Sequence, residues 1–423
     1  MEAYAQVLNY AIPFFVSLII IEQVAAHFMG KKINRGADVI SSLSSGNSNT
    51  IKDVLGLSIA IVSYSWLVDK VAVFDIKATW AVAAIAFVAK DFAGYWMHRW
   101  EHEINFLWNR HIIHHSSEEY NLSCALRQSV SEVFSIFALL MLPAAIMGVP
   151  AEIIAVVAPL HLFAQFWYHT RLIGKMGWFG KVFVTPSHHR VHHAINSIYL
   201  DKNYSQVFII WDKIFGTFQP ELAEVPPVYG VKKPVRTWNP LLINFQHFWL
   251  LFTDAWHTKS WKDKFLLWFK HTGYRPADVA EKYPVKIIND PYSLDKYDPK
   301  LSTPLLYWSW FQMVANFAFM LWLFNHIAEI GMPDMFYYGA FLIIAIFSYT
   351  TLMDRSKYAL LTEFIKAALG LGFIYWQGND WFGMNAVWPV GTYIIVAYFV
   401  LSLVVVAYFV KTECGEEKEV ALA

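Results

Sequence analysis

The sequence predicts an all-α integral membrane protein, a bundle of about nine membrane-spanning helices. The 423 residues are 57% hydrophobic and have a mean hydropathy of +0.36, well above the apolar share of a typical soluble domain. Long apolar runs also recur along the chain, most of them near the length needed to cross a bilayer. The predicted spans are 8–28, 54–74, 79–97, 133–149, 152–168, 305–326, 336–353, 357–376 and 386–410.

Three segments within this frame need separate interpretation. The first apolar run follows MEAYAQ, which lacks the basic region of a signal peptide, so we expect it to stay as a membrane anchor. Residues 40–50, ISSLSSGNSNT, are rich in Ser, Asn and Gly and predict a polar connector with turns. The stretch 133–168 is also compatible with a hairpin that does not fully cross the bilayer.

Lys and Arg lie almost entirely in one set of the predicted loops. If the N-terminus is outside, the loops 29–53, 98–132 and 169–304 lie on the other side and carry most of the basic residues, with Lys70 and Lys77 as exceptions. Cytoplasmic loops of membrane proteins carry an excess of Lys and Arg. This distribution predicts a multi-pass protein of a bacterial inner membrane or the endoplasmic reticulum, with these three loops in the cytoplasm.

We divide the chain into N-terminal membrane anchor helices (1–97), a histidine-rich region (98–220), a cytoplasmic or interfacial amphipathic segment (221–303), and C-terminal transmembrane helices with a tail (304–423). The third region mixes Trp, Phe and Leu with Lys, which is typical of helices in the membrane interface. Packing against the histidine-rich region is the alternative. Glu363 and Lys366, one helical turn apart in a predicted span, indicate either a polar pathway or an ion pair.

Histidine is concentrated in one part of the chain. Eleven of the 16 histidines lie between His98 and His193, most of them in HRWEH (98–102), HIIHH (111–115) and HHRVHH (188–193). Side chains three or four residues apart share a helix face, so each cluster would aim two or three imidazoles at one point. Because imidazole is the commonest metal-binding side chain, the clusters predict a metal centre.

The number of imidazoles indicates two metal ions. Imidazole suits Zn, Cu, Fe and Ni alike, but a catalytic zinc needs only about three protein ligands. The Glu-x-x-His repeat of carboxylate-bridged di-iron bundles is absent from the sequence. With only Cys124 and Cys414, neither a disulfide framework nor a CxxC site is predicted. The net charge of zero favours no nucleic-acid partner.

The three clusters resemble the ordered HxxxH, HxxHH and HxxHH signature of the membrane-bound fatty acid hydroxylase and sterol desaturase superfamily. The likeness runs from about Asp91 to about Val235. Flanking phrases such as WEHEINFLWNRHIIHHSSEEYNLSCALRQS and TPSHHRVHHAIN are most similar to the members that cleave alkylglycerol ethers. The resemblance implies a non-haem di-iron monooxygenase that uses O2 to hydroxylate a C–H bond of a lipid taken from the bilayer.

The resemblance also implies roles for single residues. It assigns nine metal ligands: His98, His102, His111, His114, His115, His169, His189, His192 and His193. Gln165 stands where related desaturases have an amide that reaches a metal through water. We expect His188 to lie beside the ligands without binding the metal, and His161 to be either a core histidine or a ligand. The ether-cleaving members imply oxidation beside the ether oxygen to an aldehyde and glycerol, with tetrahydrobiopterin or a redox protein as electron donor.

Polar residues near the clusters are further candidates. Glu101 can accept a hydrogen bond from an imidazole and so set its tautomer. Asp91, two turns before His98 on the same helix face, can do the same, and a carboxylate at membrane depth is costly unless paired. With Gln165, these form the candidate catalytic set. The substrate-binding candidates are Asn121, Arg127 and Gln128, which would hold a polar head group; ordinary structural use is the alternative.

Two other functions remain open. A fatty acid hydroxylase or a sterol oxidase or desaturase would use the same histidines without a pterin. A membrane metal transporter would place its ionisable ligands near the midplane of the bilayer, whereas here the clusters lie at the cytoplasmic ends of the predicted spans.

Overall fold

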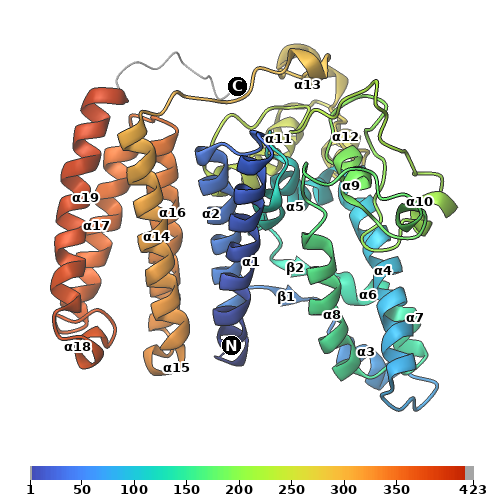
Figure 1. Cartoon of the computed structure of the whole chain (residues 1–423), viewed down its shortest axis with the longest axis horizontal. Coiled ribbons are helices and arrows are strands. Elements are labelled where there is room, and N and C mark those ends of the chain that lie inside the picture. The colour runs from blue at the N-terminus through green and yellow to red at the C-terminus, as the bar shows by residue number, and fades with distance from the viewer. Residues whose placement is uncertain (1, 415–423) are drawn as a thin grey trace.

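The computed structural model describes residues 2–414. Figure 1 shows long, roughly parallel helices. Short helices and loops, among them α9, α12 and α13, form a cap over the upper end of the right-hand half of the molecule. The long helices are α1 (Glu2–Phe28), α2 (Gly36–Val54), α4 (Trp80–Glu103), α5 (Asn105–His115), α8 (Ala151–Phe166), α11 (Pro240–His257), α14 (Thr303–Asn325), α16 (Asp334–Met353), α17 (Ala359–Trp376) and α19 (Gly391–Glu413).

Short elements fill the connections. The short α-helices are α3 (Tyr64–Val71), α6 (Phe137–Leu140), α7 (Leu142–Ile146), α9 (Pro186–His192), α10 (Ile210–Ile214), α12 (Trp261–Leu266), α13 (Ala277–Lys282), α15 (Ile327–Ile330) and α18 (Met384–Val387). The 3-10 helices are η1 (Leu122–Leu126), η2 (Phe179–Lys181) and η3 (Pro291–Ser293). Within residues 2–414 the one sheet pairs β1 (Ile59–Ala60) with β2 (Phe134–Ser135) in parallel. The protein is therefore helical, as predicted.

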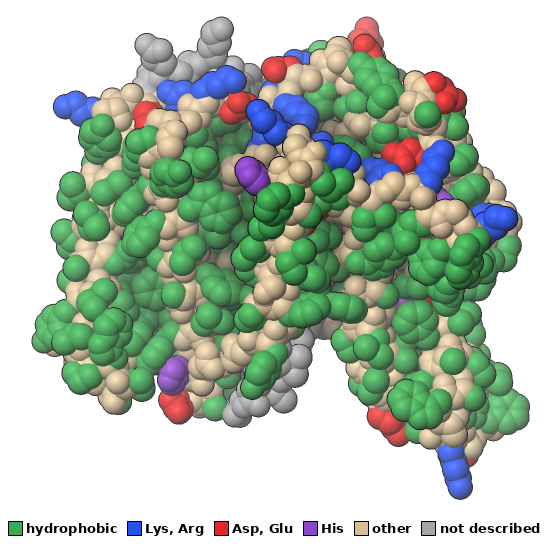
Figure 2. All heavy atoms as spheres, in the orientation of Figure 1, with side chains coloured by type: hydrophobic (Ala, Val, Ile, Leu, Met, Phe, Trp, Pro, Cys, Tyr) green, Lys and Arg blue, Asp and Glu red, His purple; other side chains and the backbone are tan. Residues whose placement is uncertain are grey.

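Among the described residues, four helices are long and apolar enough to cross a membrane: α1 from Leu8, α16, α17 and α19. Three of these, together with α14, form the C-terminal bundle at the left of Figure 1. Hydrophobic side chains cover most of the face drawn in Figure 2, while most of the Lys and Arg on it, together with some Asp and Glu, gather at the capped end. This distribution is that of a membrane protein with one charged end.

The predicted spans 54–74 and 133–149 are wrong. Instead of two crossing helices, these segments form β1, α3, β2, α6 and α7, and they pair with each other: Ile59 N donates to Val133 O at 2.7 Å, and Val73 N donates to Ile146 O at 2.8 Å. Gly148 ends the second segment with φ +79°, and a Cβ there would lie 1.8 Å from Phe74 O. The two segments thus hydrogen-bond to each other instead of forming two continuous helices, and Gly148 permits the close approach of their backbones.

The predicted polar connector at 40–50 is also wrong, because these residues lie inside α2. Their serines satisfy hydrogen bonds locally or with neighbours: Ser44 Oγ donates to Ile40 O at 2.6 Å, and Ser41 Oγ donates to Trp238 O at 2.7 Å. Small residues also let adjacent backbone approach, as at Gly46, whose Cβ position would lie 3.1 Å from Leu126 O. Packing against η1, α14 and α16 stabilises this helix despite its unfavourable composition.

Candidate metal centre

Four segments position the nine predicted histidine ligands. His98 and His102 lie one turn apart at the end of α4, and His111, His114 and His115 lie on α5. His169 follows α8, and the last three come from α9 and its C-cap. Helix α9 begins favourably with Pro186 in its first turn. All nine side chains are buried or nearly so.

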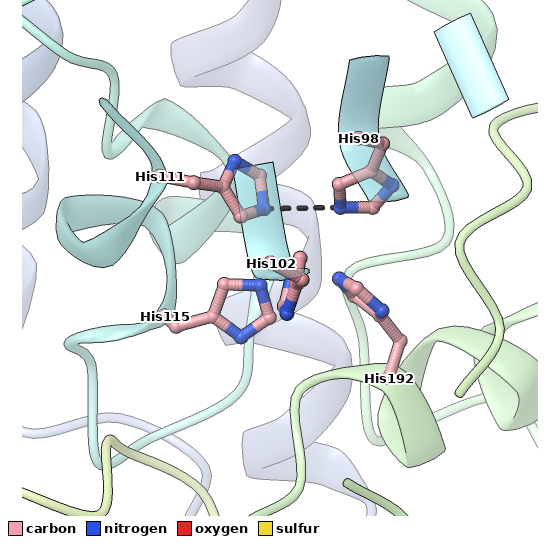
Figure 3. A group of neighbouring side chains, drawn as sticks. All are labelled: His98, His102, His111, His115 and His192. Atoms are coloured by element: carbon pink, nitrogen blue, oxygen red, sulfur yellow. Dashed lines mark hydrogen bonds between the residues drawn. The ribbon is translucent and has the colours of Figure 1, made fainter. Parts of the chain in front are cut away.

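The structure brings these histidines together in two groups. Group one contains His98, His102, His111, His115 and His192, whose rings converge from three elements in Figure 3. Group two contains His114, His169, His189 and His193. Within each group, one nitrogen from every ring lies within 4.8 Å of the others. The groups adjoin, since the rings of His115 and His193 stack with centroids 4.3 Å apart.

Backbone carbonyls determine the tautomer of several rings. Nδ1 of His98 lies 2.7 Å from Tyr204 O, and Nδ1 of His192 lies 3.0 Å from Lys202 O. In group two, Nδ1 of His169 lies 3.0 Å from Gln165 O. A carbonyl oxygen only accepts, so each of these Nδ1 atoms carries the hydrogen and Nε2 keeps its lone pair. This is the arrangement in which Nε2 binds a metal.

The free nitrogens fit a bound cation. The Nε2 atoms of His102, His115 and His192 are buried and have no hydrogen-bond partner among residues 2–414. Buried polar atoms are normally paired, so these lone pairs require something absent from the protein chain. Nε2 of His98 and Nε2 of His111 are 3.0 Å apart, about the separation of two ligands at right angles on an ion with bonds of about 2.1 Å.

Burial also keeps the imidazoles neutral. Desolvation, followed by repulsion between neighbouring imidazoles, holds the pKa of His115, His192 and His193 well below its ordinary value. The same causes lower the pKa of His189. Neutral imidazole is the form that coordinates metals. Nine neutral imidazoles suit Zn, Cu, Fe and Ni alike, so this ligand set fits a metal ion without selecting which one.

Glu101 lies beside group one. Its Oε2 is 3.4 Å from Nδ1 of His111, and its Oε1 is 3.4 Å from the guanidinium of Arg110. Burial raises the pKa of Glu101 to about 8. The structure therefore places this carboxyl where it can orient His111. Two nearby carboxylates, those of Glu118 and Glu119, pair with Arg35 and contact no histidine of the two groups in any described ion pair.

Asp91, His161 and Gln165 form a separate chain of contacts. The fully buried Asp91 carboxylate accepts hydrogen bonds from Val207 N (2.8 Å), Phe208 N (3.0 Å), Trp211 Nε1 (2.8 Å) and, at 2.8 Å, His161 Nε2. The side-chain amide of Gln165 lies 3.1 Å from Nδ1 of His161. His161 thus belongs to neither group. Asp91 joins α4 to the loop before α10, and a catalytic role for it stays a prediction.

The three substrate-binding candidates make their hydrogen bonds within the protein. Arg127 is fully buried, and its guanidinium donates to Asp38 Oδ1 (2.8 Å), Ser116 Oγ (2.6 Å) and Ser42 Oγ (3.0 Å). Asn121 Oδ1 caps η1, and its Nδ2 donates to Ile33 O at 3.0 Å. Gln128 Nε2 donates to Ala125 O at 3.0 Å. A role for these residues in holding a head group stays a prediction, and these contacts give it no support.

Sequence reasoning missed Tyr204 and Asp38. The carbonyl of Tyr204 orients His98, and its ring centroid lies 5.3 Å from that of His102. Asp38 holds Arg127 next to the segment that carries His115, and it also accepts from Ser117 Oγ at 2.9 Å. No local pattern marks either residue, because each acts through contacts distant in sequence. His188 lies outside both groups, with its ring near Phe218.

Comparisons with known proteins agree with this site. The model of the family described as fatty acid hydroxylase matches residues 83–217, which contain all nine histidines. The chain is 34% identical to the alkylglycerol monooxygenase of Homo sapiens over 369 residues, 85% of this chain and 81% of that protein. It is 36% identical to that of Danio rerio over 293 residues, 66% of this chain and 64% of the relative.

A more distant relative is the ornithine lipid hydroxylase OlsE of Rhizobium tropici, 28% identical over 135 residues, 32% of this chain and 40% of that protein. No solved structure matches the chain significantly. Each of these three relatives is named as an oxygenase or hydroxylase, and none as a transporter. The comparisons therefore oppose the metal-transporter alternative.

Proposed function

Because this chain belongs to the fatty acid hydroxylase family and is a membrane lipid monooxygenase, we propose that it holds two iron ions and oxidises alkylglycerol ethers. The observation that carries the proposal is the division of nine buried histidines into two adjoining groups with unpaired nitrogens. Two groups suit two ions, and imidazole suits iron. The alkylglycerol monooxygenases similar to most of this chain support the substrate.

The proposed reaction inserts one oxygen atom of O2 into the C–H bond beside the ether oxygen, while the other becomes water. A tetrahydrobiopterin supplies the two electrons. The hemiacetal that results breaks into a long-chain aldehyde and glycerol. When bound, the iron ions would supply the activation of O2 that no protein side chain provides.

The chain's own residues would prepare the site. Group one would hold one ion, group two the other, and the carbonyls of Tyr204, Lys202 and Gln165 orient the rings. Burial of the rings excludes water, which protects a reactive centre from side reactions. Aromatic side chains line it: the ring of Tyr168 lies 4.4 Å from that of His189, and the ring of Trp108 lies 5.0 Å from that of His102.

We also propose that the centre faces the cytoplasm. The basic residues at the capped end in Figure 2 support this orientation, in which the N-terminus lies on the opposite side. A cysteine introduced at the exposed Lys282 should then react only in permeabilised membranes, and one at Met332, which is 73% exposed, should react from outside. Reversed labelling would invert the orientation without affecting the chemistry.

Turnover of a lipid panel by the purified full chain tests the function. We expect about two irons per chain by elemental analysis, and release of a long-chain aldehyde from alkylglycerol only when reduced pterin is present. A single zinc per chain would contradict the metal proposal. Oxidation of free fatty acids, sterols or an amino-acid-derived lipid without pterin would contradict the substrate proposal and favour a reaction like that of the more distant relative.

A further inference from the structure

Helix α11 has two faces of opposite and unusual character. The side packed against the rest of the protein buries polar residues beside Ile243 and Leu251: Asn244 Oδ1 accepts from Ser129 Oγ at 3.1 Å, and His247 Nε2 lies 2.9 Å from Asn105 O. The outer side exposes large apolar side chains, among them Leu242, Phe245, Trp249, Phe252 and Trp256. Helices on the surface of soluble proteins show the reverse pattern.

The exposed residues form one continuous stripe. They recur at intervals of three and four residues, so they lie on one helix face over four turns. Trp249 is 65% exposed and Trp256 74% exposed. The next helix continues the pattern with Trp261 and Phe265, and the turn after it adds Phe269; each of the three is at least 68% exposed. We call these eight side chains the aromatic face.

Basic residues border the aromatic face. Lys259 is exposed in the turn between α11 and α12, Lys262 is exposed in α12 itself, and Lys270 is exposed just beyond α12. The Lys264 ammonium lies 5.7 Å from the Trp261 ring centroid. Trp and Phe beside Lys are characteristic of helices that lie in the lipid headgroup region, where the rings reach the acyl boundary and the ammonium groups meet anionic lipids.

Helix α11 is not a candidate membrane span. Among the described residues, it is not one of the four helices apolar enough to cross a membrane. Its buried face packs on α5, which carries three of the clustered histidines. A helix in this position is held at the capped end of the molecule (Figure 1). Because α11 does not cross the bilayer, its aromatic face needs some other apolar surface to contact.

We infer that the aromatic face of α11 and α12 inserts into the headgroup–acyl boundary of the bilayer that holds the transmembrane helices, with Lys259, Lys262 and Lys270 contacting anionic phospholipids. The partner is thus lipid of the same membrane leaflet. The charge of the bordering lysines favours a lipid surface over a second copy of this chain, whose corresponding face would carry the same positive charge.

Fluorescence quenching in the full-length protein tests the inference. Trp249→Cys and Trp256→Cys variants, each labelled with a polarity-sensitive dye, are placed in vesicles of phosphatidylcholine with phosphatidylglycerol and shallow spin-labelled lipid. The matched control is Glu281→Cys, an exposed position on α13. We expect the dye at 249 and 256 to be quenched several-fold more than the dye at 281. Equal quenching at all three positions would overturn the inference.

Two further arms separate the partners. The quenching is compared in vesicles with and without phosphatidylglycerol, and we expect it to be greater with this anionic lipid. A Lys259→Glu/Lys262→Glu variant of the labelled protein should lose that difference, while a Lys286→Glu variant, altered at another exposed lysine, should retain it. Energy transfer between labelled copies that persists on dilution with lipid would assign the face to a second copy and overturn the lipid assignment. Neither outcome depends on enzymatic activity or on metal content.

Discussion

The histidine centre and the C-terminal bundle both bury ionisable side chains, but they treat them differently. In the centre, ring nitrogens of His102, His115 and His192 point at one another without hydrogen-bond partners in the described chain. In the bundle, Glu363 on α17 pairs with Lys366 at 2.6 Å. The first arrangement is incomplete without a ligand, whereas the second is complete in itself.

The bundle cluster is closed by neutral partners. Lys366 Nζ donates to Gln312 Oε1 (3.0 Å), Tyr398 Oη (3.1 Å) and Ser402 Oγ (3.2 Å), and Ser348 Oγ donates to Glu363 Oε2 at 2.8 Å. These contacts confirm the ion pair and leave no free position for a passing ion on either charged group. Buried charge alone therefore does not identify a functional site. Buried ring nitrogens that converge without hydrogen-bond partners are the better indication.

The largest expected effect is the loss of a histidine from either group. His115→Ala or His193→Ala should lower activity by more than about 100-fold and reduce bound metal, because each removes a nitrogen ligand. The control is His188→Ala, since His188 is buried in the same segment but outside both groups. Metal analysis and turnover of membrane-inserted protein measure the effect. Full metal content in His115→Ala would remove that residue from the site.

Breaking one partner of the bundle cluster should affect stability but not metal. Glu363→Gln or Lys366→Met should each destabilise the protein by about 3–5 kcal/mol, because an unpaired buried charge remains. The double variant, which leaves no charge, should recover part of that loss. Thermal unfolding in detergent gives the stability, and elemental analysis gives the metal. Loss of iron in the double variant would show that the two regions are coupled.

Replacement of Arg127 tests whether it is structural or holds substrate. Arg127→Lys cannot keep all three hydrogen bonds to Asp38, Ser116 and Ser42 and should destabilise the protein by about 1–3 kcal/mol. KM for alkylglycerol should stay unchanged in the folded fraction. A large increase in KM with unchanged unfolding temperature would restore the substrate role predicted from the sequence.

Glu101→Gln should weaken the centre less than loss of a ligand. The amide keeps the shape of Glu101 but can turn an N–H group instead of a carboxyl oxygen towards Nδ1 of His111, so metal affinity should fall by about 10-fold, within the range for groups that orient ligands. Competition with a chelator measures the affinity. Glu103→Gln is a suitable control, because Glu103 pairs with Arg99 and not with a histidine. Equal effects of the two variants would show that Glu101 does not act through His111.

The smallest effect concerns a buried carboxyl that pairs with no Lys or Arg in the described part of the chain. Burial raises the pKa of Asp354 to about 7, above its ordinary value, despite hydrogen bonds from Trp238 N and Tyr297 Oη. Between pH 4 and 7 the folded protein then holds a proton that the unfolded chain releases, so stability should decline as pH rises through this window. Asp354→Asn should flatten the dependence of the melting temperature on pH; an unchanged slope would exclude this carboxyl as its source.

The amino-acid sequence alone was enough to predict the membrane character, the histidine clusters and the family. Apolar length and composition are local properties, so α16, α17 and α19 were predicted within a few residues. The spacing of three or four residues in each cluster depends only on the period of the helix. For the same reason, which histidines of one helix share a face is visible in the sequence alone.

How the clusters combine depends on the packing of the helices, which the sequence does not show. His114 and His115 are adjacent in sequence yet belong to different groups, as do His192 and His193. Neighbouring residues on a helix point about 100° apart, and the packing of α4, α5 and α9 determines which group each ring joins. Contacts likewise turned the serine-rich segment into the buried α2 and directed the aromatic face of α11 outward. Such outcomes depend on partners distant in the chain, which no local pattern encodes.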